Sequence, residues 1–159
     1  MDGSERRHRR ERTGTVSTSP LPPLTKQYYE RIADLRRTLR EFARNTELEA
    51  ERIGLTPQQY QLLLAIKGFP LRDWASVGEL AERLQIRHNA IVGLVRRAEQ
   101  RGLVERMPYR SGDRRKAYIR LTSDGDVALA QLAGALRAER EKVLLAVDLL
   151  SDAPAREAV

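Results

Sequence analysis

The stretch SVGELAERLQIRHNAIVGLVRRAEQRG, residues 76–102, predicts two short helices joined by a tight turn. Ser76 and Glu79 have the spacing of a capping box, in which the two side chains satisfy free backbone N–H groups at a helix start. A three-residue turn follows Leu84, and the second helix begins near His88 and stops at Gly102. Two short helices connected in this way are typical of a helix-turn-helix motif.

The second helix has one apolar side and one polar side. Ile91, Leu94, Val95 and Ala98 recur at helical spacing and are expected to face the core. The polar side could read DNA, because Asn and Gln pair with adenine, Arg pairs with guanine, and a helix fits the major groove. For His88, an ordinary surface position at the helix start is the alternative. The candidate DNA-contacting residues of this helix are Arg87, His88, Asn89, Val92, Gly93, Arg96, Arg97 and Gln100.

After Gly102 the pattern alternates, as in strands. LVERM (103–107) and KAYIR (116–120) are separated by a turn at 108–113, which predicts a β-hairpin. Beside a helix in the major groove, a cationic hairpin reaches the adjacent DNA backbone or minor groove. Asp113 is expected to hold Arg115 in one orientation or, alternatively, to make a turn hydrogen bond. The candidate wing residues are Arg110, Asp113, Arg114, Arg115 and Lys116.

Helices are predicted on both sides of this region. Thr56, Pro57 and Gln59 mark the start of a helix that ends near Gly68, and a loop (68–75) follows it. Residues 25–54 and a single long helix after Thr122 carry apolar residues at heptad spacing. A homodimer is the expected cover for these stripes, and pairing of the two helices within one chain is the alternative for part of them. The candidate dimerisation residues are Tyr28, Ile32, Leu35, Leu39, Phe42, Val143, Val147 and Leu150.

Composition narrows the class of function. The 159 residues include no Cys and only two distant His, so no metal site is expected. The sequence also has no helical H-E-x-x-H pair and no phosphate-cradling glycine loop, so no cofactor and no enzymatic activity are expected. The net charge is +7, and residues 87–120 hold ten Lys or Arg against three acids, which is typical of a polyanion-binding surface. No stretch has the length of a membrane span or the pattern of a secretory leader. A cytoplasmic location is therefore expected, on the nucleoid when DNA is bound.

These features together resemble the MarR (multiple-antibiotic-resistance regulator) family of winged-helix transcription factors, over roughly residues 25–150. The resemblance rests on VGELAERL, a following helix that ends in RGLV, Asp113-x-Arg115, and LTxxG at Leu121, Thr122 and Gly125. It implies a mainly α (α+β) fold, namely a winged helix-turn-helix with flanking N- and C-terminal dimerisation helices. It also implies a homodimer that binds a pseudo-palindromic operator in double-stranded DNA, and often a small aromatic effector that releases the DNA. The candidate ligand-binding residues are Tyr28, Tyr29, Phe69 and Trp74, with plain packing as the alternative for Trp74.

The composition of residues 1–24 predicts a disordered basic tail. With the resemblance, the rest of the chain divides into an N-terminal dimerisation helix (25–54), a winged helix-turn-helix domain (55–122) and C-terminal dimerisation helices (123–159). Several positions depart from the family pattern. Gln85 replaces a turn Gly, so a left-handed conformation there would be strained, and Arg87 replaces a Ser cap. Gly93 replaces a long polar side chain, Ala98 replaces a larger core residue, and SDAPAREAV (151–159) suggests a shortened last helix. A sequence-specific regulator, more often a repressor in such families, is the leading interpretation. A sequence-tolerant DNA-associated protein and a winged-helix module that binds an acidic protein are the alternatives.

Overall fold

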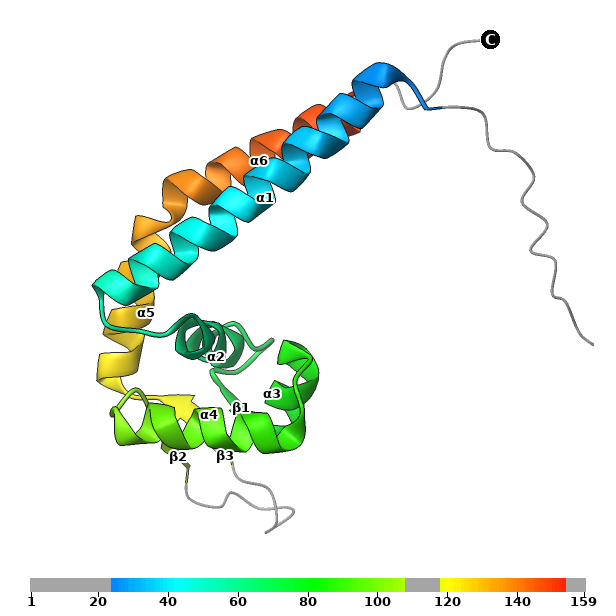
Figure 1. Ribbon diagram of the computed structural model, residues 1–159. Coiled ribbons are helices and arrows are strands. Elements are labelled where there is room, and N and C mark those ends of the chain that lie inside the picture. Colours follow the sequence, from blue (N-terminus) through cyan, green and yellow to red (C-terminus); the bar gives the residue numbers. More distant parts are fainter. Residues whose placement is uncertain (1–23, 108–117, 154–159) are drawn as a thin grey trace, which may run out of the picture.

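The two helices predicted on either side of Gln85 are both present in the computed structural model, which describes residues 24–107 and 118–153. α2 to β3 form one unit, the winged unit. α1 and α6 lie side by side as an arm, and α5 joins the arm to the winged unit (Figure 1). The predicted tail, the hairpin tip and residues 154–159 lie outside the described residues. In chain order the elements are α1 (Lys26–Arg52), α2 (Pro57–Lys67), β1 (Trp74–Ser76), α3 (Val77–Leu84), α4 (His88–Gln100), β2 (Val104–Arg106), β3 (Tyr118–Leu121), α5 (Ser123–Ala135) and α6 (Arg137–Ser151).

The helix-turn-helix has the predicted caps and the predicted strain. The Ser76 hydroxyl accepts from the Glu79 N–H at 3.3 Å, and the Glu79 carboxylate accepts from the Ser76 N–H at 2.8 Å. Gln85 ends α3 in the left-handed region, with φ at 55°, where a residue other than Gly is strained. Arg87 makes no side-chain cap at the start of α4, as its chemistry predicts.

The core of the winged unit forms around α2 and the inner side of α4. Thr56 and Gln59 make the predicted capping box at the start of α2. Leu62, Leu63 and Ile66 of this helix are fully buried, because α3, α4, α5 and β3 all pack against α2. The prediction for the inner side of α4 is confirmed, since its four apolar residues, Ile91, Leu94, Val95 and Ala98, are buried.

The small sheet has a strand that the sequence did not predict. Its order is β1-β3-β2, and both pairs are antiparallel. Residues 68–75 were expected to form a loop, but Trp74–Ser76 pairs with β3, and Ser76 lies opposite Tyr118. A three-residue strand is too short for an alternating pattern to be recognised. The other two strands lie within the predicted hairpin, although β3 extends one residue further, to Leu121.

The LTxxG motif fastens α5 to the sheet. The Thr122 hydroxyl donates to the Gly102 carbonyl and accepts from the Gly125 N–H, while the Thr122 N–H donates to the Leu103 carbonyl at 3.1 Å. A Cβ atom at position 125 would lie 2.0 Å from the Leu103 carbonyl oxygen. The motif therefore needs glycine there because the first turn of α5 lies directly on the backbone before β2.

After Thr122 the chain forms two helices, α5 and α6, so the prediction of one long helix there is wrong. Leu136 ends α5 with φ −86° and ψ 7°, and α6 then runs in a new direction along α1 (Figure 1). Leu129, Leu132 and Leu136 are buried in the core of the winged unit, whereas no residue of α6 is buried. The heptad pattern continues through the break, so spacing alone does not reveal it. None of the described helices is long and apolar enough to span a membrane.

Candidate nucleic-acid interface

The outer side of α4 lies on the surface next to the strands of the wing. α4 packs against β2, and β2 and β3 lie beside it where the chain enters and leaves residues 108–117 (Figure 1). The predicted recognition helix and the base of the predicted wing therefore meet on one side of the molecule. This arrangement follows from the short connection at Gly102, whose φ of 67° turns the chain from α4 directly into β2.

The predicted DNA-contacting side chains of α4 are accessible. Asn89 and Gln100 are exposed, and Val92 is 40% exposed. Gly93 is half-buried, and a Cβ atom there would lie 3.3 Å from the Arg97 guanidinium. The glycine therefore leaves room for the Arg97 side chain to lie along the helix surface. The other predicted members of this face, Arg87, His88, Arg96 and Arg97, are exposed as well.

Apart from Arg101, the described arginines of the basic stretch, residues 87–120, fall into two groups. Arg106 pairs with Glu99 at 2.9 Å, and Arg120 pairs with Glu105 at 2.7 Å, so acids within the protein neutralise both. Arg87, Arg96 and Arg97 form no ion pair with any residue of the described part of the chain. The unpaired positive charge of the described residues in this stretch is thus concentrated on α4, where it is available to an anionic partner.

Arg101 serves a structural role that sequence reasoning missed. Its guanidinium donates to the Gln59 side-chain oxygen at 2.8 Å, and the same oxygen accepts from the Thr56 N–H at 3.0 Å. The C-terminal end of α4 is therefore tied to the capping box of α2. The two partners are 42 residues apart in sequence, so no local pattern could have indicated the contact.

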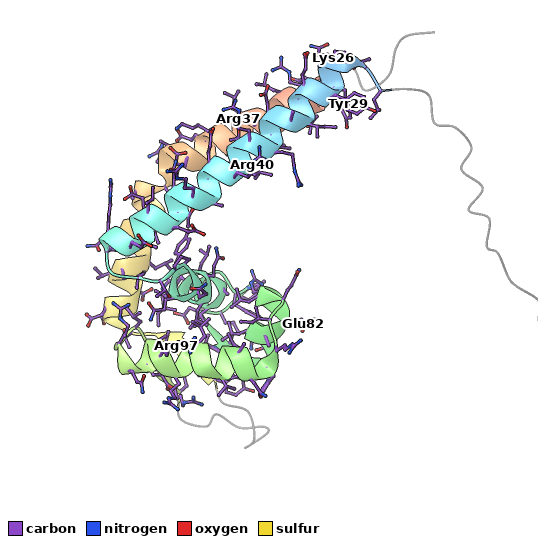
Figure 2. All side chains as sticks on the ribbon, viewed as in Figure 1. Lys26, Tyr29, Arg37, Arg40, Glu82 and Arg97 are labelled. Atoms are coloured by element: carbon purple, nitrogen blue, oxygen red, sulfur yellow. The ribbon has the colours of Figure 1, made fainter. Side chains whose placement is uncertain are left out.

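The predicted wing residues and the predicted ligand-binding residues have different outcomes. The candidate wing residues, Arg110, Asp113, Arg114, Arg115 and Lys116, lie outside the described residues. Phe69 and Trp74 both lie against Arg72, beside the sheet. Tyr29 lies at the far end of α1 (Figure 2), and Tyr28 precedes it in the first turn of the same helix. The four candidate ligand-binding residues therefore do not line one cavity within a single chain.

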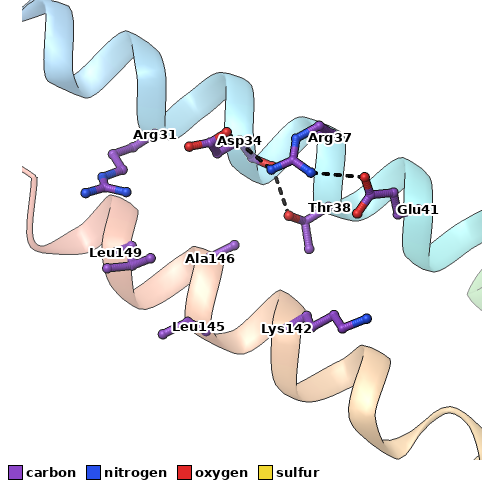
Figure 3. A pocket seen from close by; sticks show the side chains of 9 residues that line it. All are labelled: Arg31, Asp34, Arg37, Thr38, Glu41, Lys142, Leu145, Ala146 and Leu149. Atoms are coloured by element: carbon purple, nitrogen blue, oxygen red, sulfur yellow. Dashed lines mark hydrogen bonds and ion pairs between the residues drawn. The ribbon is translucent and has the colours of Figure 1, made fainter.

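The predicted dimerisation residues lie on the arm. Most of them are half-buried, while Leu39 and Val147 are exposed. Leu144 (63% exposed) and Leu145 (59% exposed), which the heptad pattern did not select, are the most exposed leucines of α6. A hollow of about 280 Å³ lies between the two helices, and Leu145, Ala146 and Leu149 of α6 line it (Figure 3). Arg37 lies on its rim, paired with Asp34 at 3.5 Å and Glu41 at 3.1 Å.

Comparison with known proteins relates one segment of the chain to the MarR family. Residues 53–116 match the model of the MarR family. The HTH-type transcriptional repressor MdtR of Bacillus subtilis (strain 168) is 33% identical over 85 residues, which cover 53% of this chain and 52% of MdtR. The chain thus matches about half the length of this curated relative.

Solved structures show the same fold at low sequence identity. AbsC, a MarR family transcriptional regulator from Streptomyces coelicolor, has a TM-score of 0.61 at 20% identity, with 80% of this chain and 84% of AbsC covered. A mutant MarR from E. coli complexed with operator DNA has a TM-score of 0.58 at 19% identity, with 75% of this chain and 85% of that chain covered. At these identities the likeness establishes the fold alone.

Proposed function

We propose that the protein is a MarR-family DNA-binding transcriptional regulator that acts as a repressor, because residues 53–116 match the model of that family and the relative MdtR is a transcriptional repressor. The observation that carries the proposal is the unpaired positive charge on the exposed side of α4. Arg87, Arg96 and Arg97 have no acidic partner within the described residues, whereas the cations of β2 and β3 are paired. α4 is 13 residues long and its outer side chains are exposed, so it can enter a major groove.

Sequence reading would come from the polar side of α4. Asn89 and Gln100 can each pair with adenine, and Arg96 can pair with guanine. Arg87 and His88 lie at the first turn, where backbone N–H groups favour phosphate. The wing residues Asp113 and Arg115 remain a prediction for the minor groove. Release by a small aromatic effector likewise remains a prediction.

A homodimer is the proposed assembly, and the arm supplies its interface. α6 carries an apolar run, VLLAV (143–147), yet none of its residues is buried within the chain. Two-fold symmetry would present two copies of α4 to DNA about one helical turn, roughly 34 Å, apart. The operator is then expected to be pseudo-palindromic, because a symmetric dimer reads each half-site with the same helix. Action on the chromosome would place the protein in the cytoplasm, on the nucleoid when bound.

The test compares the affinity of the protein for DNA as the salt concentration is raised. The probe is a labelled duplex from the DNA flanking its own gene, with a random duplex as competitor. About 6–10 phosphate contacts give a steep fall of log affinity with log salt, by about 0.9 for each contact. Preference for the flanking duplex by about a thousandfold would indicate sequence reading, and no preference would indicate the sequence-tolerant alternative.

A matched pair of variants assigns the contact to α4. Arg96→Ala removes an unpaired cation and is expected to make the salt dependence shallower, by about 0.9 for each phosphate that Arg96 neutralises. Arg106→Ala removes the same charge from a pair with Glu99 and should leave the salt dependence unchanged. Equal effects of the two substitutions would refute the assignment to α4, and a shallow slope for the wild-type chain would refute DNA binding.

A further inference from the structure

Arg72 lies between two aromatic rings. Its guanidinium carbon is 4.2 Å from the centroid of the Phe69 ring and 4.0 Å from the centroid of the Trp74 ring. The side chain is only 24% exposed although it is a cation in a surface loop. A flat guanidinium held between two rings has few available rotamers, so its position is well defined. We call Phe69, Arg72 and Trp74, together with Tyr118, whose ring contacts that of Trp74, the Arg72 stack.

The stack connects the first helix of the helix-turn-helix with the sheet. Arg72 pairs with the Glu79 carboxylate, whose second oxygen accepts from the Ser76 N–H at the start of α3. The Trp74 ring meets the Tyr118 ring edge-on, with centroids 4.8 Å apart and planes at 79°. Tyr118 is the first residue of β3, the strand that follows the hairpin tip. One cation therefore joins the start of α3 to the base of the wing.

The other end of α3 is also held by this region. The Arg83 guanidinium donates to the Gly68 carbonyl at 3.1 Å and lies 5.3 Å from the centroid of the Phe69 ring. Arg83 is in the last turn of α3, two residues before the left-handed turn at Gln85 that leads into α4. Both ends of α3 are thus fixed to the segment that carries the stack.

The turn between Phe69 and Arg72 is strained, and this turn places the Arg72 side chain. Leu71 has φ at 64°, in the left-handed region that Leu disfavours, and its side chain is fully exposed. Packing of the Leu71 side chain cannot stabilise that conformation. The turn brings the Arg72 N–H to 3.4 Å from the Phe69 carbonyl, so the chain folds back and Arg72 returns toward the Phe69 ring.

We propose that Arg72 is a positioning residue for DNA binding, which fixes α3 and the turn into α4 relative to β3 without contacting DNA itself. The inference rests on the proposed function, because it concerns how two DNA-binding elements are held in register. A recognition helix and a wing that are misaligned would still attract phosphate, but would read base pairs less well. Loss of Arg72 should therefore reduce specificity more than non-specific binding.

The test uses the full chain, a labelled duplex from the DNA flanking its own gene and a random duplex of equal length. Arg72→Gln removes the cation from the stack, whereas Arg72→Lys keeps the charge pair with Glu79 but removes the flat guanidinium. Arg52→Gln is the control, because it removes the same charge from an exposed pair with Glu49 inside α1. Circular dichroism gives the folded fraction of each variant, and affinities are corrected for it.

In Arg72→Gln, the emission of Trp74, the one tryptophan of the chain, should change in the absence of DNA. The preference for the flanking duplex should fall about tenfold, the size of one misread base pair. The salt dependence should keep its wild-type slope, because every phosphate-binding cation is still present. Arg72→Lys should recover part of the preference, and Arg52→Gln should behave as wild type.

Three results would overturn the inference while leaving the proposed function intact. The first is unchanged Trp74 emission in Arg72→Gln, and the second is changed emission with wild-type preference. The third is a slope shallower by about 0.9 or more, which would make Arg72 a phosphate ligand. A wild-type chain that binds neither duplex would instead refute the proposed function, and this inference with it.

Discussion

Gly125 shows how a single residue can control the distance between two elements. The Thr122 hydroxyl bridges the Gly102 carbonyl and the Gly125 N–H, which draws the first turn of α5 onto the backbone of Leu103. No side chain fits in the remaining space, because a Cβ atom would lie 2.0 Å from a backbone oxygen that cannot move away on its own. The winged unit therefore depends on this glycine for its packing and not for its backbone freedom.

Gly125→Ala is expected to destabilise the protein, because α5 must shift away from β2 to admit the methyl group. The expected decrease is about 1–3 kcal/mol in the free energy of unfolding, measured by chemical denaturation. Gly134→Ala, in the same helix, is the matched control. A Cβ atom there meets nothing within 4 Å, so this change should stabilise the protein by up to about 1 kcal/mol. A neutral effect of Gly125→Ala would contradict the geometry.

The residues that the sequence identified correctly are those with local signals. Caps at Thr56 and Ser76 and the inner side of α4 follow from neighbours within four residues, whereas the strained turn at Gln85 was expected only from the family resemblance. Arg101 on Gln59 and Arg72 between two rings could not be predicted in this way. Their geometry depends on tertiary packing, and in sequence both arginines are ordinary surface cations.

At the scale of elements, length and burial explain the two mispredictions. β1 has three residues, too few to show a period, and its pairing with β3 depends on a distant strand. The break at Leu136 falls inside a continuous apolar pattern. It is required because the leucines of α5 belong to the winged core while α6 follows α1. Periodicity reports that a helix has an apolar side and not which neighbour covers it.

The start of α3 should make stability depend on pH. Burial raises the pKa of Glu79, but hydrogen bonds from the Ser76 N–H and from Arg72 outweigh burial, so the pKa lies below its ordinary value. A carboxylate with a lowered pKa in the folded state stabilises the protein above the unfolded-state pKa, about 4.3, and this contribution disappears as pH falls through the folded-state value. Glu79→Gln should therefore destabilise the protein at neutral pH.

The difference in the free energy of unfolding between wild type and Glu79→Gln should shrink as the pH falls from about 7 to about 3, because protonation removes the charge from the wild-type side chain. Denaturant midpoints of both proteins, measured at several pH values across this range, test the expectation. A difference that stays constant, or grows, in acid would show that the carboxylate charge does not stabilise the cap.

For the whole molecule, the arm is the part whose apolar side chains one chain alone leaves uncovered. α1 and α6 form a two-helix hairpin that extends away from the winged unit (Figure 1). A pair of helices buries only one side of each, and α6 keeps Leu144, Leu145 and Leu149 exposed. Isolated exposed leucines are common on protein surfaces, but several on one helix indicate an interface. A second copy of the arm would cover them symmetrically.

Leu145→Glu is therefore expected to dissociate the dimer. Leu145 is exposed on α6, so the substitution would place a carboxylate in the proposed interface on each protomer, at about 3 kcal/mol or more for each charge left buried and unpaired. Sedimentation equilibrium should give twice the 18.1 kDa chain mass for wild type and the mass of one chain for the variant. Val127→Glu is the control, because Val127 is 57% exposed on α5 and outside the arm.

Dissociation of the dimer should also weaken DNA binding in a particular way. Leu145→Glu should lower the affinity for a two-half-site duplex far more than the affinity for a single half-site, because the monomer keeps α4 but not its symmetric partner. Val127→Glu should bind both duplexes as wild type does. A wild-type chain that sediments as a monomer, or a Leu145→Glu variant that remains dimeric, would place the interface elsewhere.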